Sequence, residues 1–136
     1  MRVVLDPNVL IAALLSASGT PARLLLRWLN GEFELVVSDL LLAEFRRACG
    51  YSKISRRVSA EAVDELEALL CDSAQLLIDP ERPRRRSADP GDDYLVALAE
   101  AGSAILVSGD RHLLDLEAGN RILSPQAFMA VLDATR

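Results

Sequence analysis

The chain has 136 residues, of which half are apolar and only 4% aromatic, and it carries a net charge of −5. This length fits one domain over residues 1–136, and no apolar run approaches the ~20 residues that cross a bilayer. The negative charge argues against nucleic-acid binding by bulk electrostatics, and two cysteines indicate no disulfide framework. The first residues lack a signal-peptide pattern, so we expect a cytoplasmic protein with no membrane partner.

The first predicted element is a strand over Val3–Leu5, because this run is continuous, apolar and β-branched, as in buried parallel strands. It ends on Asp6. Pro7 then suits the first position of a helix that should continue to Leu15. Asp6 should therefore lie at the carboxyl end of a central strand, where open α/β sheets place their ligand sites. A carboxylate there could cap the helix or bind a hard metal ion.

Capping signals and hydrophobic periodicity predict alternating helices and strands along the rest of the chain. The predicted helices cover residues 20–30, 38–49, 60–71, 89–101 and 125–134, with a short helical turn at 112–116. The predicted strands cover residues 33–37, 75–78, 105–107 and 121–123, while 51–59 and 79–88 are expected to be basic connections. This alternation predicts an α/β fold, a three-layer α/β/α sandwich around a mainly parallel sheet of four to five strands.

Acidic residues recur at the ends of these elements. The strand over 105–107 is followed by Ser108, Gly109 and Asp110, which repeats the design of the first strand. Glu44 interrupts an apolar helical run, and Asp92 and Asp93 lie near the start of a helix. Each has a structural alternative, namely a cap, a turn residue or a favourable charge at a helix start. Four separated acids at such positions are nevertheless hard to explain by solvation alone.

The chemistry of these side chains restricts the possible site. Oxygen ligands suit Mg²⁺ or Mn²⁺, whereas a zinc site would need His and Cys ligands that the chain lacks. One histidine leaves little from which to build a Ser–His–Asp centre, and there is no phosphate-binding P-loop. The arginines could hold phosphates around the acids, or they could form a solvated face: Arg46, Arg47, Arg84, Arg85, Arg86 and Arg111.

Four passages, VVLDPNVLIAALLS, VVSDLLLAEF, DPGDDYLVALAEAG and LVSGDRHLLDL, resemble the PIN-domain nucleases, and within them the small prokaryotic toxins of toxin–antitoxin pairs. They occur in family order and span nearly the whole chain. The resemblance implies that one or two divalent ions are held by four catalytic acids, Asp6, Glu44, Asp93 and Asp110. Asn8 and Ser108 match supporting positions, and Asp92 is the alternative to Asp93. The chain departs from the family at Pro7, where many members have Thr or Ser, and at His112, where many have Asp.

The resemblance therefore implies a metal-dependent endoribonuclease that forms a homodimer and is silenced by a small antitoxin. An antitoxin could insert an arginine among the acids and cover apolar helix surface near Leu24–Trp28 and Val63–Leu70. Trp28 could be a partner anchor or a core residue. The alternatives are a PIN-fold binding module without activity and, less favoured, a Mg²⁺-dependent phosphoacceptor. A phosphoacceptor would need a lysine near the last strands, and Lys53 lies in the middle of the chain.

Overall fold

The computed structural model describes residues 1–81, 92–116 and 121–135, and these form an α/β sandwich around one parallel sheet. The sheet has five strands in the order β3-β2-β1-β4-β5, and neighbouring strands pair in parallel throughout the described residues. The strands are β1 (Arg2–Leu5), β2 (Glu34–Val37), β3 (Gln75–Leu76), β4 (Ile105–Val107) and β5 (Ile122–Leu123). The predicted fold class is confirmed.

The helices begin and end close to the predicted limits. They are α1 (Pro7–Leu15), α2 (Thr20–Leu29), α3 (Asp39–Cys49), α4 (Ser52–Ser55), α5 (Ala60–Ser73), α6 (Asp93–Ala101), α7 (Arg111–Leu114) and α8 (Pro125–Ala134). Side-chain oxygens cap several of them, because the first helical N–H groups have no partner within the helix. Ser38, Ser59 and Ser124 each accept a backbone N–H in this way.

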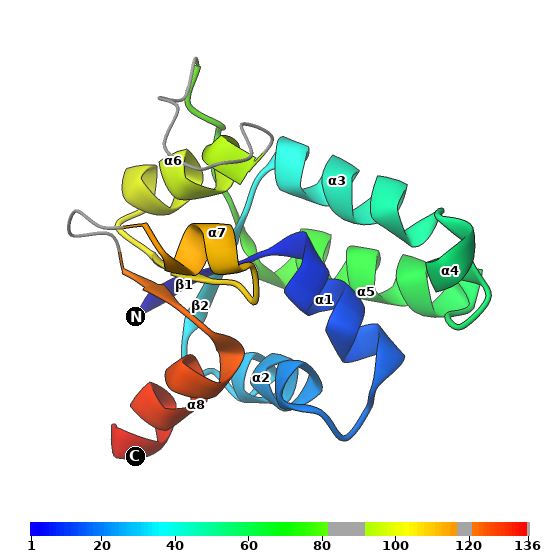
Figure 1. Cartoon of the computed structure of the whole chain (residues 1–136), viewed down its shortest axis with the longest axis horizontal. Coiled ribbons are helices and arrows are strands. Elements are labelled where there is room, and N and C mark those ends of the chain that lie inside the picture. The colour runs from blue at the N-terminus through cyan, green and yellow to red at the C-terminus, as the bar shows by residue number, and fades with distance from the viewer. Residues whose placement is uncertain (82–91, 117–120, 136) are drawn as a thin grey trace.

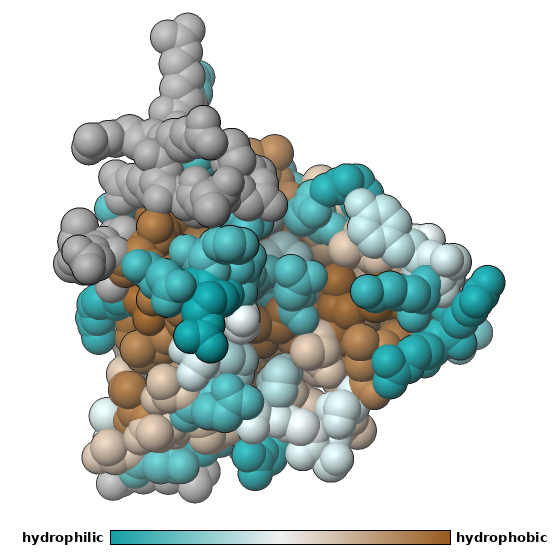
Figure 2. All heavy atoms as spheres, viewed as in Figure 1, coloured by the Kyte–Doolittle hydropathy of each residue, from teal (hydrophilic) through white to brown (hydrophobic). Residues whose placement is uncertain are grey.

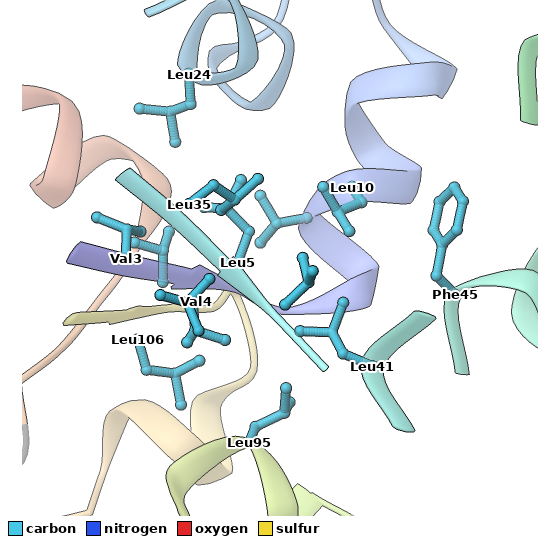
Figure 3. Packing of buried hydrophobic residues seen from close by; sticks show 14 of the residues in the cluster. Val3, Val4, Leu5, Leu10, Leu24, Leu35, Leu41, Phe45, Leu95 and Leu106 are labelled. Atoms are coloured by element: carbon cyan, nitrogen blue, oxygen red, sulfur yellow. The ribbon is translucent and has the colours of Figure 1, made fainter. Parts of the chain in front are cut away.

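The helices form two layers on either side of the sheet. α6 packs against β1 and β4, whereas α8 packs against α2, and α1 contacts both α2 and α3. In Figure 1, α6 lies on one side of the strands and α2 and α8 lie on the other. Figure 3 shows the same arrangement from inside, with Leu24 of α2 and Leu95 of α6 on opposite sides of the strands. This topology places β1 and β4 side by side at the centre of the sheet.

The core consists mainly of aliphatic residues, as the composition predicts. Val3, Val4 and Leu5 are at most 1% exposed, which confirms that β1 is a buried central strand. Phe33 and Phe128 pack edge to face with ring centroids 5.2 Å apart. Trp28 is 6% exposed and belongs to this core, so its role as a partner anchor is not supported.

The structure corrects several local predictions. The basic connection at 51–59 contains a short helix, α4, and β3 ends at Leu76 rather than Ile78. Leu24, Val63 and Leu70 are themselves buried, but Leu26, inside the predicted stretch Leu24–Trp28, is 58% exposed. Leu29, directly after that stretch, is also exposed, so apolar surface is present on this part of α2. For α2 and α5 the reason is that periodicity identifies the apolar face of a helix but not which of its residues another element covers.

Hydrophilic side chains lie over α7 and around α4 on the face shown in Figure 2. Within the described ranges, no single helix is long and apolar enough to cross a membrane; only α1 and α2 together reach that length, and they are bent by 104°. Asp89, at which the predicted helix over 89–101 begins, and the arginines Arg84, Arg85 and Arg86 lie outside the described residues.

Candidate functional site

Asp6 lies where β1 ends beside β4. Leu5 pairs with Val107 in the parallel sheet, and the Asp6 N–H donates to the Val107 carbonyl at 2.9 Å. The Asp6 side chain is accordingly buried, with only 3% of the residue exposed. Its Oδ1 accepts the Asn8 N–H at 2.9 Å, and its Oδ2 accepts the Ser108 hydroxyl at 2.8 Å. Asp6 is therefore both the cap of α1 and a buried carboxylate at the carboxyl edge of the sheet.

Ser108 links the ends of the two central strands. While its hydroxyl donates to Asp6, its Oγ accepts the Asp110 N–H at 3.0 Å. Asp110 then caps α7, because its Oδ1 accepts the His112 N–H at 2.8 Å. The second strand-end acid thus repeats the local geometry of the first, and one hydroxyl fixes the two turns against each other.

The start of α6 contributes a third acid. Asp93 is the first residue of α6 and is 3% exposed, whereas Asp92, at the cap position, is only partly buried. Asp92 makes no side-chain capping hydrogen bond, although both residues interact with other parts of the chain. Since α6 packs against β1 and β4, Asp93 is held at the same central strands that carry Asp6 and Asp110. Of the two adjacent acids, Asp93 is the buried one.

Glu44 approaches the site from α3, which contacts α1. Its side chain is 38% exposed and forms an ion pair with Arg47, one turn later on the same helix. The Arg47 Nη2 donates to both Glu44 oxygens, at 2.5 and 2.6 Å, and Nε donates to Oε2 at 3.2 Å. Arg47 also donates from Nη1 to the Tyr51 hydroxyl at 3.0 Å. The fourth predicted acid is therefore held by a cation of its own chain.

The acids affect one another electrostatically. Burial raises the pKa of Asp6 above its ordinary value, while the hydrogen bonds from Asn8 and Ser108 lower it and the charges of Asp110 and Glu44 raise it further. Burial also raises the pKa of Tyr94, and four carboxylates add to this effect, namely Asp6, Glu44, Asp92 and Asp79. Asp6, Glu44 and Asp110 thus act on one another electrostatically.

Tyr94 is a site residue that our sequence reasoning missed. Its hydroxyl oxygen is buried and has no hydrogen-bond partner among the described residues, although it lies in the field of the acids. Such an unpaired buried group is uncommon and calls for an explanation. The signal in the sequence was weak, because one tyrosine directly after two aspartates at a helix start is equally compatible with packing.

The basic residues that were predicted to contact phosphates lie in different places and have different partners. Arg46 points to α5, where it pairs with Glu67 at 2.6 Å and Asp64 at 2.8 Å, while Arg47 holds Glu44. Arg111 and His112 are exposed on α7, directly after Asp110. Beside them, a groove of about 410 Å³ lies between the start of α1 and the loop of Gly109 and Asp110. It is lined by Asn8, Val9, Ala12, Pro21, Gly109, Asp110 and Pro125.

The donor set fits a hard divalent cation by its chemistry, because it offers carboxylate oxygens. One of these acids, Asp6, is buried near other negative charges that raise its pKa, so a bound cation would stabilise its charged form. Among the residues described, however, no three His, Cys, Asp or Glu side chains converge closely enough to hold a metal ion. Mutual repulsion and the Arg47–Glu44 pair both oppose closer approach of the acids. Convergence on an ion would require Glu44 to turn away from Arg47.

Known proteins resemble this chain over most of its length. The chain is 25% identical to the uncharacterized protein MJ1680 of Methanocaldococcus jannaschii over 123 residues, which cover 90% of this chain and 79% of that protein. The crystal structure of PAE2754 from Pyrobaculum aerophilum aligns with a TM-score of 0.69 at 20% identity, over 98% of this chain and 90% of the other.

A second solved structure has the same fold. VapBC2 from Rickettsia felis, solved bound to a DNA fragment from its promoter, contains a chain that aligns with a TM-score of 0.64 at 17% identity. The alignment covers 91% of this chain and 98% of that one. A family model described as PIN domain matches residues 2–112. Together with the parallel sheet and the acids at its carboxyl edge, this match shows that the chain belongs to the PIN domain family.

Proposed function

We propose that this protein is a divalent-metal-dependent endoribonuclease that hydrolyses RNA phosphodiester bonds. The observation that supports the proposal most directly is the Ser108 bridge, which joins Asp6 and Asp110 across adjacent strand ends in a buried acidic environment. PIN domains are generally metal-dependent nucleases. Asp6 and Asp110 follow adjacent strands of the sheet, and Asp93 begins the helix that packs against those strands. Mg²⁺ or Mn²⁺ matches their oxygen donors.

Asp6, Asp93, Asp110 and Glu44 would hold the cation. When bound, it supplies an activated water molecule and relieves the charge that develops on the leaving oxygen. The protein keeps the ligands in place: Ser108 and the Asn8 N–H each bind one oxygen of Asp6 and fix its orientation. Within the described residues, only the Oδ1 oxygen of the Asp110 carboxylate accepts a hydrogen bond, so its Oδ2 is available to a ligand. His112 and Arg111, exposed directly after it, would contact RNA phosphates.

The proposal is tested by cleavage of a panel of labelled single-stranded RNAs with Mg²⁺ or Mn²⁺. We expect cleavage that is lost with a chelator and reduced at least ~100-fold in Asp6→Asn, since one ligand of the ion is weakened. Asp72→Asn is the matched control, because Asp72 is exposed on α5 and contacts only Ser73 among the described residues. Cleavage that persists in Asp6→Asn or with the chelator would refute the proposal.

We further propose that the protein is the toxin of a toxin–antitoxin pair in the cytoplasm. The antitoxin would inhibit it by placing an arginine at Asp110 and apolar side chains in the groove between α1 and the Gly109 loop. That groove combines apolar walls with one carboxylate, which suits such a segment. Co-purification with the product of an adjacent gene, lost in Ala12→Arg at the groove wall, would support this; unchanged co-purification would argue against the groove.

A homodimer is part of the same proposal. Leu40, Leu76 and Ile78 are apolar and exposed, and the start of α3 is linked to this segment because the Leu40 N–H donates to Asp79. Exposed apolar residues at a sheet edge support self-association. Light scattering should give a mass near twice 14.8 kDa, and Ile78→Glu should shift it toward the monomer. A monomeric wild-type protein would contradict the proposal.

One observation favours the alternative, a PIN-fold binding module without hydrolytic activity. In the described residues the acids do not converge on a metal position, and Glu44 is neutralised by Arg47. Failure to bind Mn²⁺ and to cleave any RNA would favour this alternative. The phosphoacceptor alternative gains no support, since Lys53 lies on α4, a helix that packs against α3.

A further inference from the structure

Arg47 occupies both carboxylate oxygens of the acid that the proposed metal site needs. Three of its contacts go to Glu44, and a fourth goes to the Tyr51 hydroxyl one turn further along the chain. Its guanidinium also lies 6.0 Å from the centre of the Tyr51 ring. Glu44 and Arg47 are three residues apart on α3, so helix geometry alone brings them together.

This pair limits what Glu44 can do. Glu44 is close enough to Asp6 to affect its protonation, yet no three acids among the described residues are arranged to hold a metal ion. A cation among the acids would compete with Arg47 for the same two oxygens. Both side chains are substantially exposed, 62% for Arg47 and 38% for Glu44, and exposed pairs of this kind change an equilibrium by no more than about five-fold. The pair is therefore weak enough for a divalent ion to replace.

We propose that Glu44 exchanges partners, from Arg47 in the metal-free protein to the divalent ion in the loaded one, and that the released Arg47 binds an RNA phosphate. The inference rests on the proposed function. A guanidinium matches the geometry of phosphate oxygens, and Arg47 lies one helical turn from a metal-binding acid. RNA affinity then depends on metal through Arg47 as well as through direct contact with the ion.

Arg46 provides a matched contrast on the same helix. It makes comparably short hydrogen bonds, but its partners are Glu67 and Asp64 on α5, a helix that carries none of the four predicted site acids. A cation among the site acids does not compete for those partners. Arg46 should therefore remain paired whether metal is present or not, so Arg46→Gln controls for the loss of one positive charge from α3.

The exchange is tested first without metal, by fluorescence anisotropy of a labelled single-stranded RNA in chelator. Glu44→Gln should bind RNA roughly five-fold more tightly than wild type, because Arg47 is released, whereas Arg47→Gln should stay within about two-fold of wild type. The double variant Glu44→Gln/Arg47→Gln should lose most of the gain. A gain that persists in the double variant reflects only the lost negative charge and would overturn the exchange, as would no gain at all.

The second test is Mn²⁺ binding by calorimetry, which does not depend on activity. Arg47→Gln should bind Mn²⁺ about two- to five-fold more tightly than wild type, since the competing cation is gone, while Arg46→Gln should be unchanged. Equal affinity in wild type and Arg47→Gln would overturn the exchange while leaving the proposed nuclease intact. Absence of Mn²⁺ binding in wild type would overturn the proposed function and the exchange together.

Discussion

The Asp6 carboxylate has neighbours that act on its protonation in opposite directions. Two hydrogen bonds stabilise its charged form, but burial and the charges of Asp110 and Glu44 outweigh them, so its pKa is raised. The folded protein therefore binds the Asp6 proton more tightly than the unfolded chain does. In the absence of metal, the ionised site costs stability that a bound cation would restore.

Replacement of Asp6 by Asn should show this in metal-free protein. Because the folded pKa lies above the ordinary value of 3.8, wild type should lose stability relative to Asp6→Asn as the pH rises from that value through the raised pKa. Urea unfolding in chelator should find Asp6→Asn at least as stable as wild type at pH 7, with a smaller difference near pH 4. A clearly destabilised variant at pH 7 would contradict this reasoning.

The Tyr94 hydroxyl, which has no partner within the part of the chain that the structure describes, leads to a second prediction. Removal of a buried polar group that lacks a partner relieves its desolvation cost, so Tyr94→Phe should raise the metal-free unfolding free energy by about 1 kcal/mol. Tyr51→Phe is the matched control, since the Tyr51 hydroxyl is exposed and hydrogen-bonded, and it should change stability little. A loss of stability in Tyr94→Phe would mean that the hydroxyl is hydrogen-bonded after all.

At the scale of the element, contacts at the first turn of α3 position the helix that carries Glu44. The Ser38 Oγ accepts the Leu41 N–H at 3.2 Å, and Asp79 Oδ2 accepts the Leu40 N–H at 3.1 Å. Two side chains from different segments thus satisfy neighbouring N–H groups that have no partner within the helix. The orientation of α3, and with it Glu44, depends on these contacts.

Loss of the Ser38 cap should therefore affect both stability and the site. Ser38→Ala should lower the unfolding free energy by ~1 kcal/mol and also reduce RNA cleavage. Ser59→Ala removes the equivalent cap of α5, which carries no predicted site acid, and should cost similar stability without the same loss of cleavage. Denaturant melts and initial rates measure the two effects. An equal loss of cleavage in both variants would mean that the effect is general.

At the scale of the whole molecule, the net charge of −5 limits how RNA can bind. A protein that attracts RNA by its total charge loses affinity steeply with salt, whereas a few local contacts give a shallow dependence. Anisotropy titrations with Mn²⁺ at several salt concentrations, on RNA shown by gel to remain intact, should give a slope of log K against log salt no steeper than about −3. A much steeper slope would indicate an extended basic surface instead.

The sequence alone determined most of the elements and the order in which they occur, although not the short helix α4. The caps of α3 and α8 at Ser38 and Ser124, the apolar run of β1 and the end of α6 before Gly102 are local signals, and these elements lie close to the predicted ranges. A parallel sheet followed from the alternation of strands and helices. The acids at the ends of β1 and β4 were also visible, because a strand and the turn after it occupy consecutive residues.

Only the tertiary structure decided how these residues meet. The Ser108 hydroxyl reaches Asp6 across 102 positions because β1 and β4 pair in register, and sequence spacing cannot reveal a strand pairing. Arg46 and Arg47 are adjacent and chemically identical, yet one pairs with α5 and the other with Glu44. Successive residues on a helix point about 100° apart, so the packing of α3 against its neighbours set their different partners.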